Sequence, residues 1–226
     1  MDKFLVEKYR TLGIVALIVT LSLTLLSSFL TLKTKKDFGF KSKMFYSDMM
    51  QSIQYSINNN DLPSQWALYE DGLNQVSIKE NVLNTIRVSK DCLDLQKGCF
   101  YDGYYKNLAN KLTAKKFGNK PSVLLSNGVS VAFEPSGDCR LEGESCLLMY
   151  VDLNNLEPPN TIGKDLIVFE LTNKQTGYLK PFGLNLGFGE ILNNSKFGCS
   201  KKSSEPLYCS SLLFSKNWQY DKSYPW

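Results

Sequence analysis

The chain of 226 residues contains no histidine, and this absence removes the commonest general base of enzyme active sites. Ser-His-Asp and Cys-His nucleophilic catalysis both depend on an imidazole. None of the six cysteines stands in a C-x-x-C pair, so a zinc site is not indicated. A phosphate-binding G-x-x-x-x-G-K-[ST] loop is also absent. We therefore expect no enzymatic activity and no bound cofactor.

A strong excess of charge of either sign is also lacking, since the net charge is +4. Lys and Arg number 26 against 22 Asp and Glu, and removing residues 1–32 leaves 23 basic and 20 acidic residues. Nucleic-acid binding requires a concentrated basic face, so this balance gives no reason to expect a nucleic-acid partner. A hydrophobic content of 43% and a charged content of 21% are those of a folded globular chain. The length allows one medium domain and an anchor, or two small domains at most.

One long segment has no charged residue, no Asn, no Gln and no Pro. It runs over the 21 residues Leu12–Leu32, which as a helix would reach roughly 30 Å, the thickness of the hydrocarbon core of a bilayer. A secretory signal peptide is the alternative. The apolar core of such a peptide is shorter than this segment and is followed by a small-x-small cleavage site. Here Lys33, Lys35 and Lys36 follow instead. We favour a retained single-span anchor, with residues 1–11 as a short cytoplasmic flank, 12–32 as the transmembrane helix and 33–226 as an extracytoplasmic domain.

All the cysteines lie after this apolar segment. Their sequential spacing of 7, 7 and 10 residues suggests three local disulfides, although six cysteines also allow fourteen other connectivities. Disulfides persist in oxidising compartments, which places the large domain in a periplasm or outside the cell. Six reduced, buried cysteines are the alternative. The six cysteines of the chain are Cys92, Cys99, Cys139, Cys146, Cys199 and Cys209.

The segment after the anchor has helical periodicity. Phe45, Met49 and Ile53 recur every four residues, as on one face of an amphipathic helix. This helix can continue the membrane helix, with Gly39 as its one expected break. The Asn- and Pro-containing run 58–63 should end it, because Asn and Asp favour turns and Pro cannot continue a helix.

A second helix is expected over Tyr104–Lys116, where Leu108 and Leu112 are four residues apart. The rest of the chain favours strands. Asn127-Gly128 is a strong hairpin signal, since a type I′ turn needs positive φ at both positions. The expected strands are Ser122–Ser126, Val129–Phe133, Cys146–Leu153 and Leu166–Leu171.

The loop Asp152–Asp165 is rich in oxygen-bearing side chains. Calcium takes six to eight oxygen ligands, and Asp152, Asn154, Glu157 and Asp165 are candidates to provide them. The segment lacks the spacing of an EF-hand loop. A structural alternative is an Asx-turn, in which Asp and Asn side chains accept hydrogen bonds from nearby backbone amides and fix the loop.

The same loop resembles a segment of type IV pilin-like and type II secretion pseudopilin-like proteins of bacteria. That pattern is Asp-x-Asn-Gly-x-x-x-Pro-Asn-x-x-Gly-x-Asp, and Asn155 replaces its first glycine, a substitution that tolerates positive φ. Further segments resemble the family in the same order along nearly the whole chain. They are Phe45–Ile53, Trp66, Asn127–Ser130, Cys209 with Leu212 and Leu213, Trp218, and Tyr224–Trp226.

The resemblance implies an α+β fold. Its long N-terminal helix would lie with its first half in the membrane or in a filament core and pack its second half on a small antiparallel sheet, followed by a disulfide-tied C-terminal region. It also implies a bacterial inner-membrane location, with the globular domain in the periplasm or on an extracellular filament. Other pilin-like subunits of a pilus or a secretion machine would be the partners.

The N-terminus departs from the family pattern. A processed prepilin has a small residue before Phe-Thr-Leu-x-Glu, whereas here Lys3 precedes Phe4 and Glu7 follows Phe4 by three residues. A clear prepilin peptidase site is therefore missing. Glu7 is a candidate remnant of the glutamate that pairs with a neighbouring subunit's terminal amine. The alternative is a charged flank of a membrane helix.

Two functions from different classes are compatible with these observations. The first is a structural subunit that assembles through its apolar helix. The second is a membrane-tethered binding domain that uses the same fold without polymerising. The resemblance over the whole chain favours the first, and the missing processing site favours the second.

Overall fold

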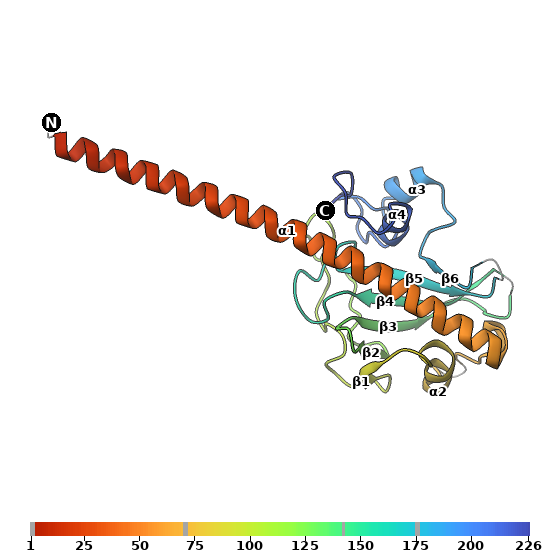
Figure 1. Cartoon of the computed structure of the whole chain (residues 1–226). Helices are drawn as coiled ribbons and strands as arrows, with labels where there is room; N and C mark the ends of the chain where they lie inside the picture. The colour runs from red at the N-terminus through yellow and green to blue at the C-terminus, as the bar shows by residue number, and fades with distance from the viewer. Residues whose placement is uncertain (1–2, 70–71, 142, 175–176) are drawn as a thin grey trace. The chain divides into compact units, whose positions relative to one another are not determined.

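The computed structural model describes residues 3–69, 72–141, 143–174 and 177–226, with side chains from residue 12 onward. The chain divides into two compact units, Met1–Asp37 and Phe38–Trp226. A single helix, α1 (Lys3–Asn60), belongs to both and passes through Gly39 without the expected break (Figure 1). Among the described residues α1 is the one helix long and apolar enough to cross a membrane, although a signal sequence would meet the same criterion.

The few polar side chains within the apolar part of α1 are suited to a lipid environment. Each hydroxyl within Leu12–Leu32 donates to a backbone carbonyl three or four residues earlier, so none of them needs water. Such internal pairing is what a polar group requires in a medium without hydrogen-bonding solvent. The donors are Thr20, Ser22, Thr24, Ser27, Ser28 and Thr31.

The second unit is built on a six-stranded antiparallel sheet in which sequence neighbours pair in the order β1-β2-β3-β4-β5-β6. The four expected strands are present, with ends shifted by one or two residues, whereas the first and last strands of the sheet were not predicted. Their bounds are β1 Val88–Cys92, β2 Ser122–Leu125, β3 Ser130–Pro135, β4 Ser145–Asp152, β5 Leu166–Thr172 and β6 Leu179–Pro181.

The β2–β3 hairpin lies where the sequence placed it, but the expected type I′ turn is wrong. Gly128 has a φ of +79°, whereas Asn127 is not among the residues with positive φ. Leu125 and Val129 close the hairpin around a three-residue loop, with the Leu125 N–H 2.8 Å from the Val129 carbonyl oxygen. The Asn127 side chain accepts the Val129 N–H at 3.1 Å. Three-residue loops of this kind need positive φ only at the glycine.

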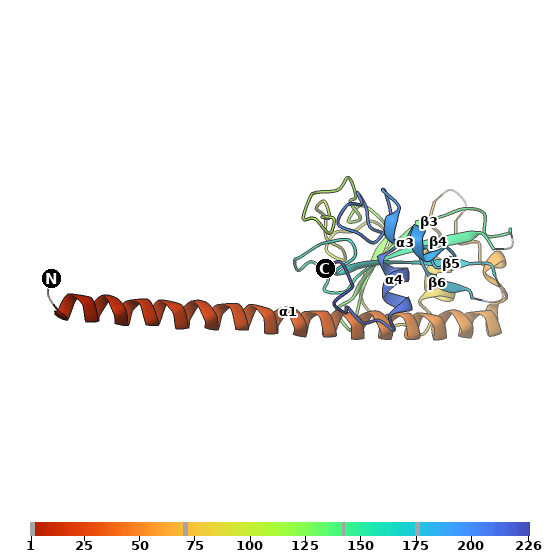
Figure 2. The same cartoon turned by 90° about the horizontal axis from the view of Figure 1, so that it is seen from above.

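The two faces of the sheet bury different partners. α1 covers one face, where Phe45, Met49 and Ile53 are buried as their spacing predicted. The other face is covered by the loops between β1 and β2 and before α4, with Phe117 and Leu207 in a second apolar cluster. Figure 2 shows α1 along one side of the sheet and these loops on the other. α1 ends at Asn60, and Asp61 has a φ of +69°, so the predicted stop is confirmed.

The helix expected over Tyr104–Lys116 is wrong. This segment is a folded loop in which the Tyr105 N–H donates to Lys115 and the Thr113 N–H donates back to Tyr105. The Asn107 side chain accepts the backbone N–H groups of residues 109 and 111, both at 3.0 Å. Asn competes with the helix by offering such local bonds. The two leucines consequently do not share a face.

The short helical elements lie in two parts of the chain, residues 63–82 before the sheet and residues 188–215 after it. The C-terminal segment after α4 reaches back to α1, where a side chain at Gly39 would overlap the Trp218 carbonyl oxygen. Glycine is therefore required at residue 39 for close approach and not as a helix break. The remaining elements are a 3₁₀ turn at Pro63–Gln65, α2 Gln75–Ser77 followed by a π turn at Ile78–Val82, α3 Phe188–Asn193 and α4 Cys209–Ser215.

The six cysteines form the three sequential disulfides that the spacing suggested. No free cysteine is found in the described part of the chain. Each bond closes a loop next to the end of a strand or directly before α4, and such short loops contribute about 2–3 kcal/mol when unstrained. The bonds support an oxidising, extracytoplasmic compartment for the second unit. They join Cys92 to Cys99, Cys139 to Cys146 and Cys199 to Cys209.

Candidate functional site

The loop between β4 and β5 holds a buried carboxylate that organises its backbone. Asp165 is fully buried directly before β5. The backbone N–H groups of Asn160 and Thr161 donate to its two carboxylate oxygens, each at 2.6 Å. A carboxylate that accepts amide hydrogens in this way fixes the path of the loop, because the alternative is unpaired buried N–H groups.

A second buried carboxylate, Asp152, lies at the end of β4 next to the first. Tyr105 donates its hydroxyl hydrogen to one oxygen of Asp152, and the Asn154 N–H donates to the other at 3.1 Å. The Leu153 N–H donates to the Asp165 carbonyl at 2.9 Å, which holds the two ends of the loop together. Tyr105 comes from the loop that was expected to be a helix, and no sequence signal linked it to this site.

The substituted glycine of the resembling pattern has the conformation that a glycine would supply. Asn155 has a φ of +64°, in the left-handed region that Asn tolerates better than most residues. Its side-chain oxygen accepts a hydrogen bond from the Ser130 hydroxyl at 2.8 Å, which ties the loop to the start of β3. The expectation that Asn can replace glycine here is therefore confirmed.

The four candidate calcium ligands do not converge as a set. Asp152 and Asp165 are brought together, but their oxygens accept protein N–H and O–H groups. The Asn154 amide nitrogen donates to the carbonyls of Glu157 and Pro158 at 2.8 and 2.9 Å, and the Glu157 side chain is exposed. The Asx-turn is formed by Asp152, whose side chain accepts the backbone N–H of Asn154 two residues later. Within the described residues, no group of three or more acidic, His or Cys side chains is arranged to hold a metal ion.

Burial sets the protonation of the acidic pair. Loss of solvent raises the pKa of Asp165 to about 6, against the opposing effect of its backbone hydrogen bonds. Burial and the neighbouring Asp165 charge raise the pKa of Asp152 well above its usual range. Burial likewise raises the pKa of the Tyr105 hydroxyl, so this group remains a donor at neutral pH. The pair therefore retains a proton at pH values where exposed carboxyl groups are ionised.

This arrangement predicts how stability depends on pH. A carboxyl whose pKa is raised by folding stabilises the fold at low pH, and the contribution is lost as pH rises through the folded pKa. We expect the free energy of unfolding to fall from about pH 4 to about pH 7, most steeply near pH 5, where Asp165 is protonated in the folded protein and ionised in the unfolded chain. Urea titrations of the full chain in neutral detergent with EDTA, followed by tryptophan fluorescence, would measure the free energy of unfolding at each pH.

The matched control is Asp152→Asn, which keeps the shape of the side chain and removes one carboxyl group. Its unfolding midpoint should vary less with pH than that of the wild type. A wild-type midpoint that rises over this pH range would contradict the protonated pair. EDTA is needed because a bound cation would hold both carboxylates ionised.

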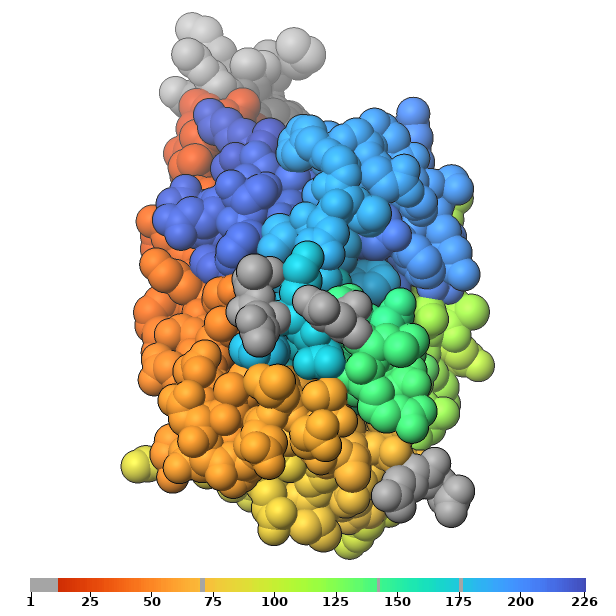
Figure 3. Space-filling view, turned by 90° about the vertical axis from the view of Figure 1, so that its right-hand side faces the viewer, coloured from red at the N-terminus to blue at the C-terminus, as the bar shows by residue number. Residues whose placement is uncertain are grey.

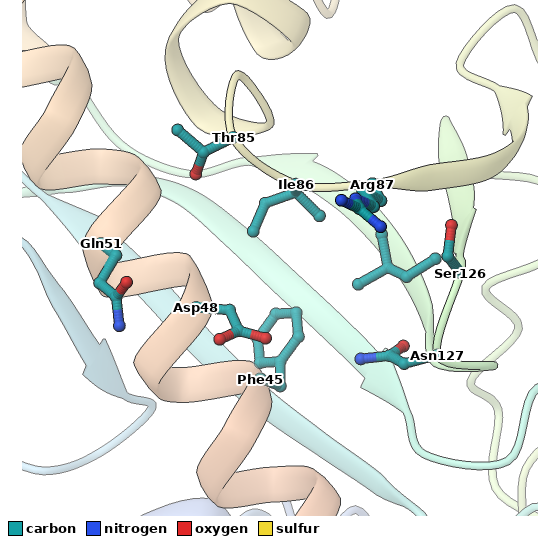
Figure 4. Close-up of a pocket in the computed structure, with 9 residues that line it drawn as sticks. Phe45, Asp48, Gln51, Thr85, Ile86, Arg87, Ser126 and Asn127 are labelled. Carbon is teal, nitrogen blue, oxygen red and sulfur yellow. The ribbon is translucent and has the colours of Figure 1, made fainter.

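A hollow of about 500 Å³ opens beside α1 (Figure 4). Its size is within the range of small-molecule sites. Asp48 and Gln51 project into it from α1, opposite Arg87 from the segment before β1 and Asn127 from the hairpin. Polar and apolar groups both line it. The sequence did not connect these residues, which belong to three separate segments.

α1 also has a face within the second unit that no other described residue of that unit covers. Phe40, Met44 and Tyr55 are 64%, 41% and 55% exposed, and Gln51 lies between them on the same face. At 3.6 residues per turn this face is about 150° from the one that carries Met49. Figure 3 shows the C-terminal turns of α1, in orange, at the molecular surface. We call residues 40, 44, 51 and 55 the free face of α1.

Glu7, the candidate assembly residue, lies within the backbone of α1, but its side chain is outside the described residues.

Comparison with known proteins gives one match. A family model described as a family of unknown function (DUF6613) matches residues 33–226. Neither the search of curated proteins nor the search of solved structures found a match. The match begins directly after the apolar segment and covers the whole second unit.

Proposed function

We propose that this chain, which belongs to the family of unknown function DUF6613, is a pilin- or pseudopilin-like structural subunit. It would assemble with other such subunits through the apolar N-terminal helix, retained as an inner-membrane anchor before assembly. The globular unit would lie in the periplasm or on the surface of an extracellular filament.

The free face of α1 is the observation that carries this proposal. A helix that only closed its own domain would need one apolar face, and Phe45, Met49 and Ile53 supply it. The large apolar side chains of Phe40 and Met44 point the other way, in the same helix that continues from the apolar segment. Exposed apolar side chains grouped in this way mark a surface that another chain covers. A helix with two apolar faces suits a subunit packed among neighbouring helices.

Cysteine crosslinking in cells tests assembly. All six native cysteines are in disulfides, so a cysteine introduced by Met44→Cys would be the one free thiol in the described part of the chain. We expect a bis-maleimide to join this variant into covalent dimers that resist reducing gels, the largest species that one thiol per chain allows. The matched control is Lys174→Cys, an exposed position in the β5–β6 turn, which should give mainly monomer.

The mature N-terminus distinguishes the two functions. An intact mass that places the start at or near Phe4, together with Met44→Cys crosslinks, supports assembly. Intact Met1 with monomer at both positions would overturn the structural role and leave a permanently tethered domain.

That second candidate is favoured by the hollow beside α1. Opposite charges at Asp48 and Arg87 on its walls, with amides from Gln51 and Asn127, suit a small ligand that carries both polar and apolar groups. A tethered binding domain would use this site without forming filaments.

A further inference from the structure

The chain has nearly equal numbers of basic and acidic residues, but these charges are unevenly distributed over its surface. The second unit has 20 basic and 19 acidic residues in its sequence. Two segments, residues 101–120 and 195–205, hold eight of these lysines and only two acids, Asp102 and Glu205. The rest of the unit therefore has 12 basic and 17 acidic residues. The nearly balanced composition of the whole chain therefore does not describe the charge of each part of its surface.

The fold brings the two segments together. The Asn107 side-chain amide donates to the Ser203 carbonyl at 3.2 Å, and Lys115 lies 3.6 Å from Glu205. Leu207 packs with Phe117 in the apolar cluster beneath them. In Figure 2 the yellow-green loop and the neighbouring blue loop lie on the side of the sheet away from α1. Four of the lysines are exposed and have no ion-pair partner among the described residues, namely Lys106, Lys111, Lys201 and Lys202. We call these four the lysine cluster.

Apolar side chains are interspersed with these charges. Leu112 is 69% exposed beside Lys111, and Tyr104 is 52% exposed with the Lys116 ammonium 5.5 Å from its ring centre. Lysine with exposed Leu and Tyr is the composition of segments that bind membrane interfaces. All eight basic residues are lysines, which lack the bidentate geometry that arginine offers to bases and phosphates of nucleic acids.

The lysine cluster lies at the same end of the second unit, in space, as the first residue of that unit. Phe38 stacks on Trp226 at 5.7 Å, and the Lys164 ammonium is 5.8 Å from the Trp226 ring. The loop that contains Lys164 pairs in turn with Lys106, whose N–H donates to the Asn160 carbonyl at 2.9 Å. Phe38 follows the uncharged segment by only six residues, which span at most about 20 Å when fully extended. The covalent connection alone keeps this end near a bilayer that holds the anchor.

We propose that the lysine cluster is a docking surface for the anionic phospholipid headgroups of the membrane in which the chain is anchored. The proposal rests on the retained anchor of the proposed function, and it goes beyond that function by assigning a lipid partner to the globular unit. Each lysine near an anionic surface strengthens binding about fivefold. Four such residues are enough to hold a tethered domain against the bilayer.

The test uses the full chain in nanodiscs of phosphatidylcholine alone or with 30% phosphatidylglycerol, a fraction taken as roughly that of an anionic membrane. Hydrogen exchange of peptides covering residues 101–117 and 196–204 is compared between the two compositions. We expect slower exchange in the anionic discs, by about fivefold or more, and loss of the difference at high salt. The variant Lys106→Glu/Lys111→Glu/Lys201→Glu/Lys202→Glu should show no difference between the two lipids.

A matched charge control separates position from net charge. Lys79→Glu/Lys90→Glu/Arg140→Glu/Lys174→Glu changes four exposed basic residues outside the two segments, which is the same change in net charge, and should keep the full lipid effect. Equal exchange of the wild type in both lipids would overturn the proposal. So would protection by an added oligonucleotide in neutral discs without protection by phosphatidylglycerol, which would indicate a nucleic-acid surface. Failure of the chain to enter nanodiscs counts against the anchor as well, whereas failed Met44→Cys crosslinking with intact lipid protection counts only against assembly.

Discussion

Replacing Asp165 by alanine is expected to lower the free energy of unfolding of the second unit by about 2–4 kcal/mol. The Asn160 and Thr161 N–H groups that donate to its carboxylate at 2.6 Å would lose their acceptor inside the protein. A buried donor without a partner costs about 1–3 kcal/mol, and part of that cost is offset because a buried acid is removed. The loop between β4 and β5 should lose its fixed path.

Glu157→Ala is the matched control, because Glu157 belongs to the same loop but its side chain is exposed. It should change stability by less than about 0.5 kcal/mol. Urea unfolding of each full-length variant in neutral detergent, followed by tryptophan fluorescence, compares them. Adding Ca²⁺ after EDTA should leave the wild-type midpoint unchanged if the loop is an Asx-turn. A calcium-dependent shift that Glu157→Ala abolishes would show instead that the loop is a metal site.

A second large effect is expected on α1. Met49→Ala should destabilise the second unit by about 2–5 kcal/mol, since Met49 is fully buried between the helix and the sheet. The lost packing and the cavity left behind both contribute to this cost. Differential unfolding by urea at one pH would measure it.

Met44→Ala provides the comparison on the same helix with the same chemical change. Met44 belongs to the free face, so its truncation should change stability by less than about 0.5 kcal/mol. Under the proposed function it should nevertheless reduce assembly in cells. Equal destabilisation by both substitutions would mean that the free face is packed within the unit, and the main support for assembly would be lost.

The hairpin and the long helix show what local sequence can specify. Asn127-Gly128 placed the β2–β3 turn because few residues tolerate the required backbone, yet the turn type depended on where Leu125 and Val129 pair. The periodicity of Phe45, Met49 and Ile53 identified the buried face of α1, since a helix repeats every 3.6 residues. The same periodicity failed at Leu108 and Leu112, where Asn107 bonds the backbone locally.

The candidate site was only half predictable for a similar reason. Asp152 and Asp165 could be found because they stand at the two ends of one loop that is rich in oxygen-bearing side chains. The same two residues belong to the pattern that resembles pilin-like proteins. Tyr105 could not be found, because it is 47 residues from Asp152 and reaches it through a loop that covers the far face of the sheet. Contacts between distant segments depend on tertiary packing, which no local pattern encodes.

The sequence by itself determined the apolar segment, the four central strands and the acidic loop, and its cysteine spacing indicated an oxidising compartment, since each depends on hydrophobicity, cysteine spacing or backbone preference over a few residues. Only the tertiary structure decided which surfaces are free and how charge is distributed over them. Two lysine-rich segments about 90 residues apart become one basic surface because Asn107 and Ser203 meet over the second apolar cluster. Likewise, Phe40 and Met44 are distinguished from Phe45 and Met49 only by which side of α1 the sheet covers. Burial is a property of the assembled layers, and so are the sites that remain uncovered.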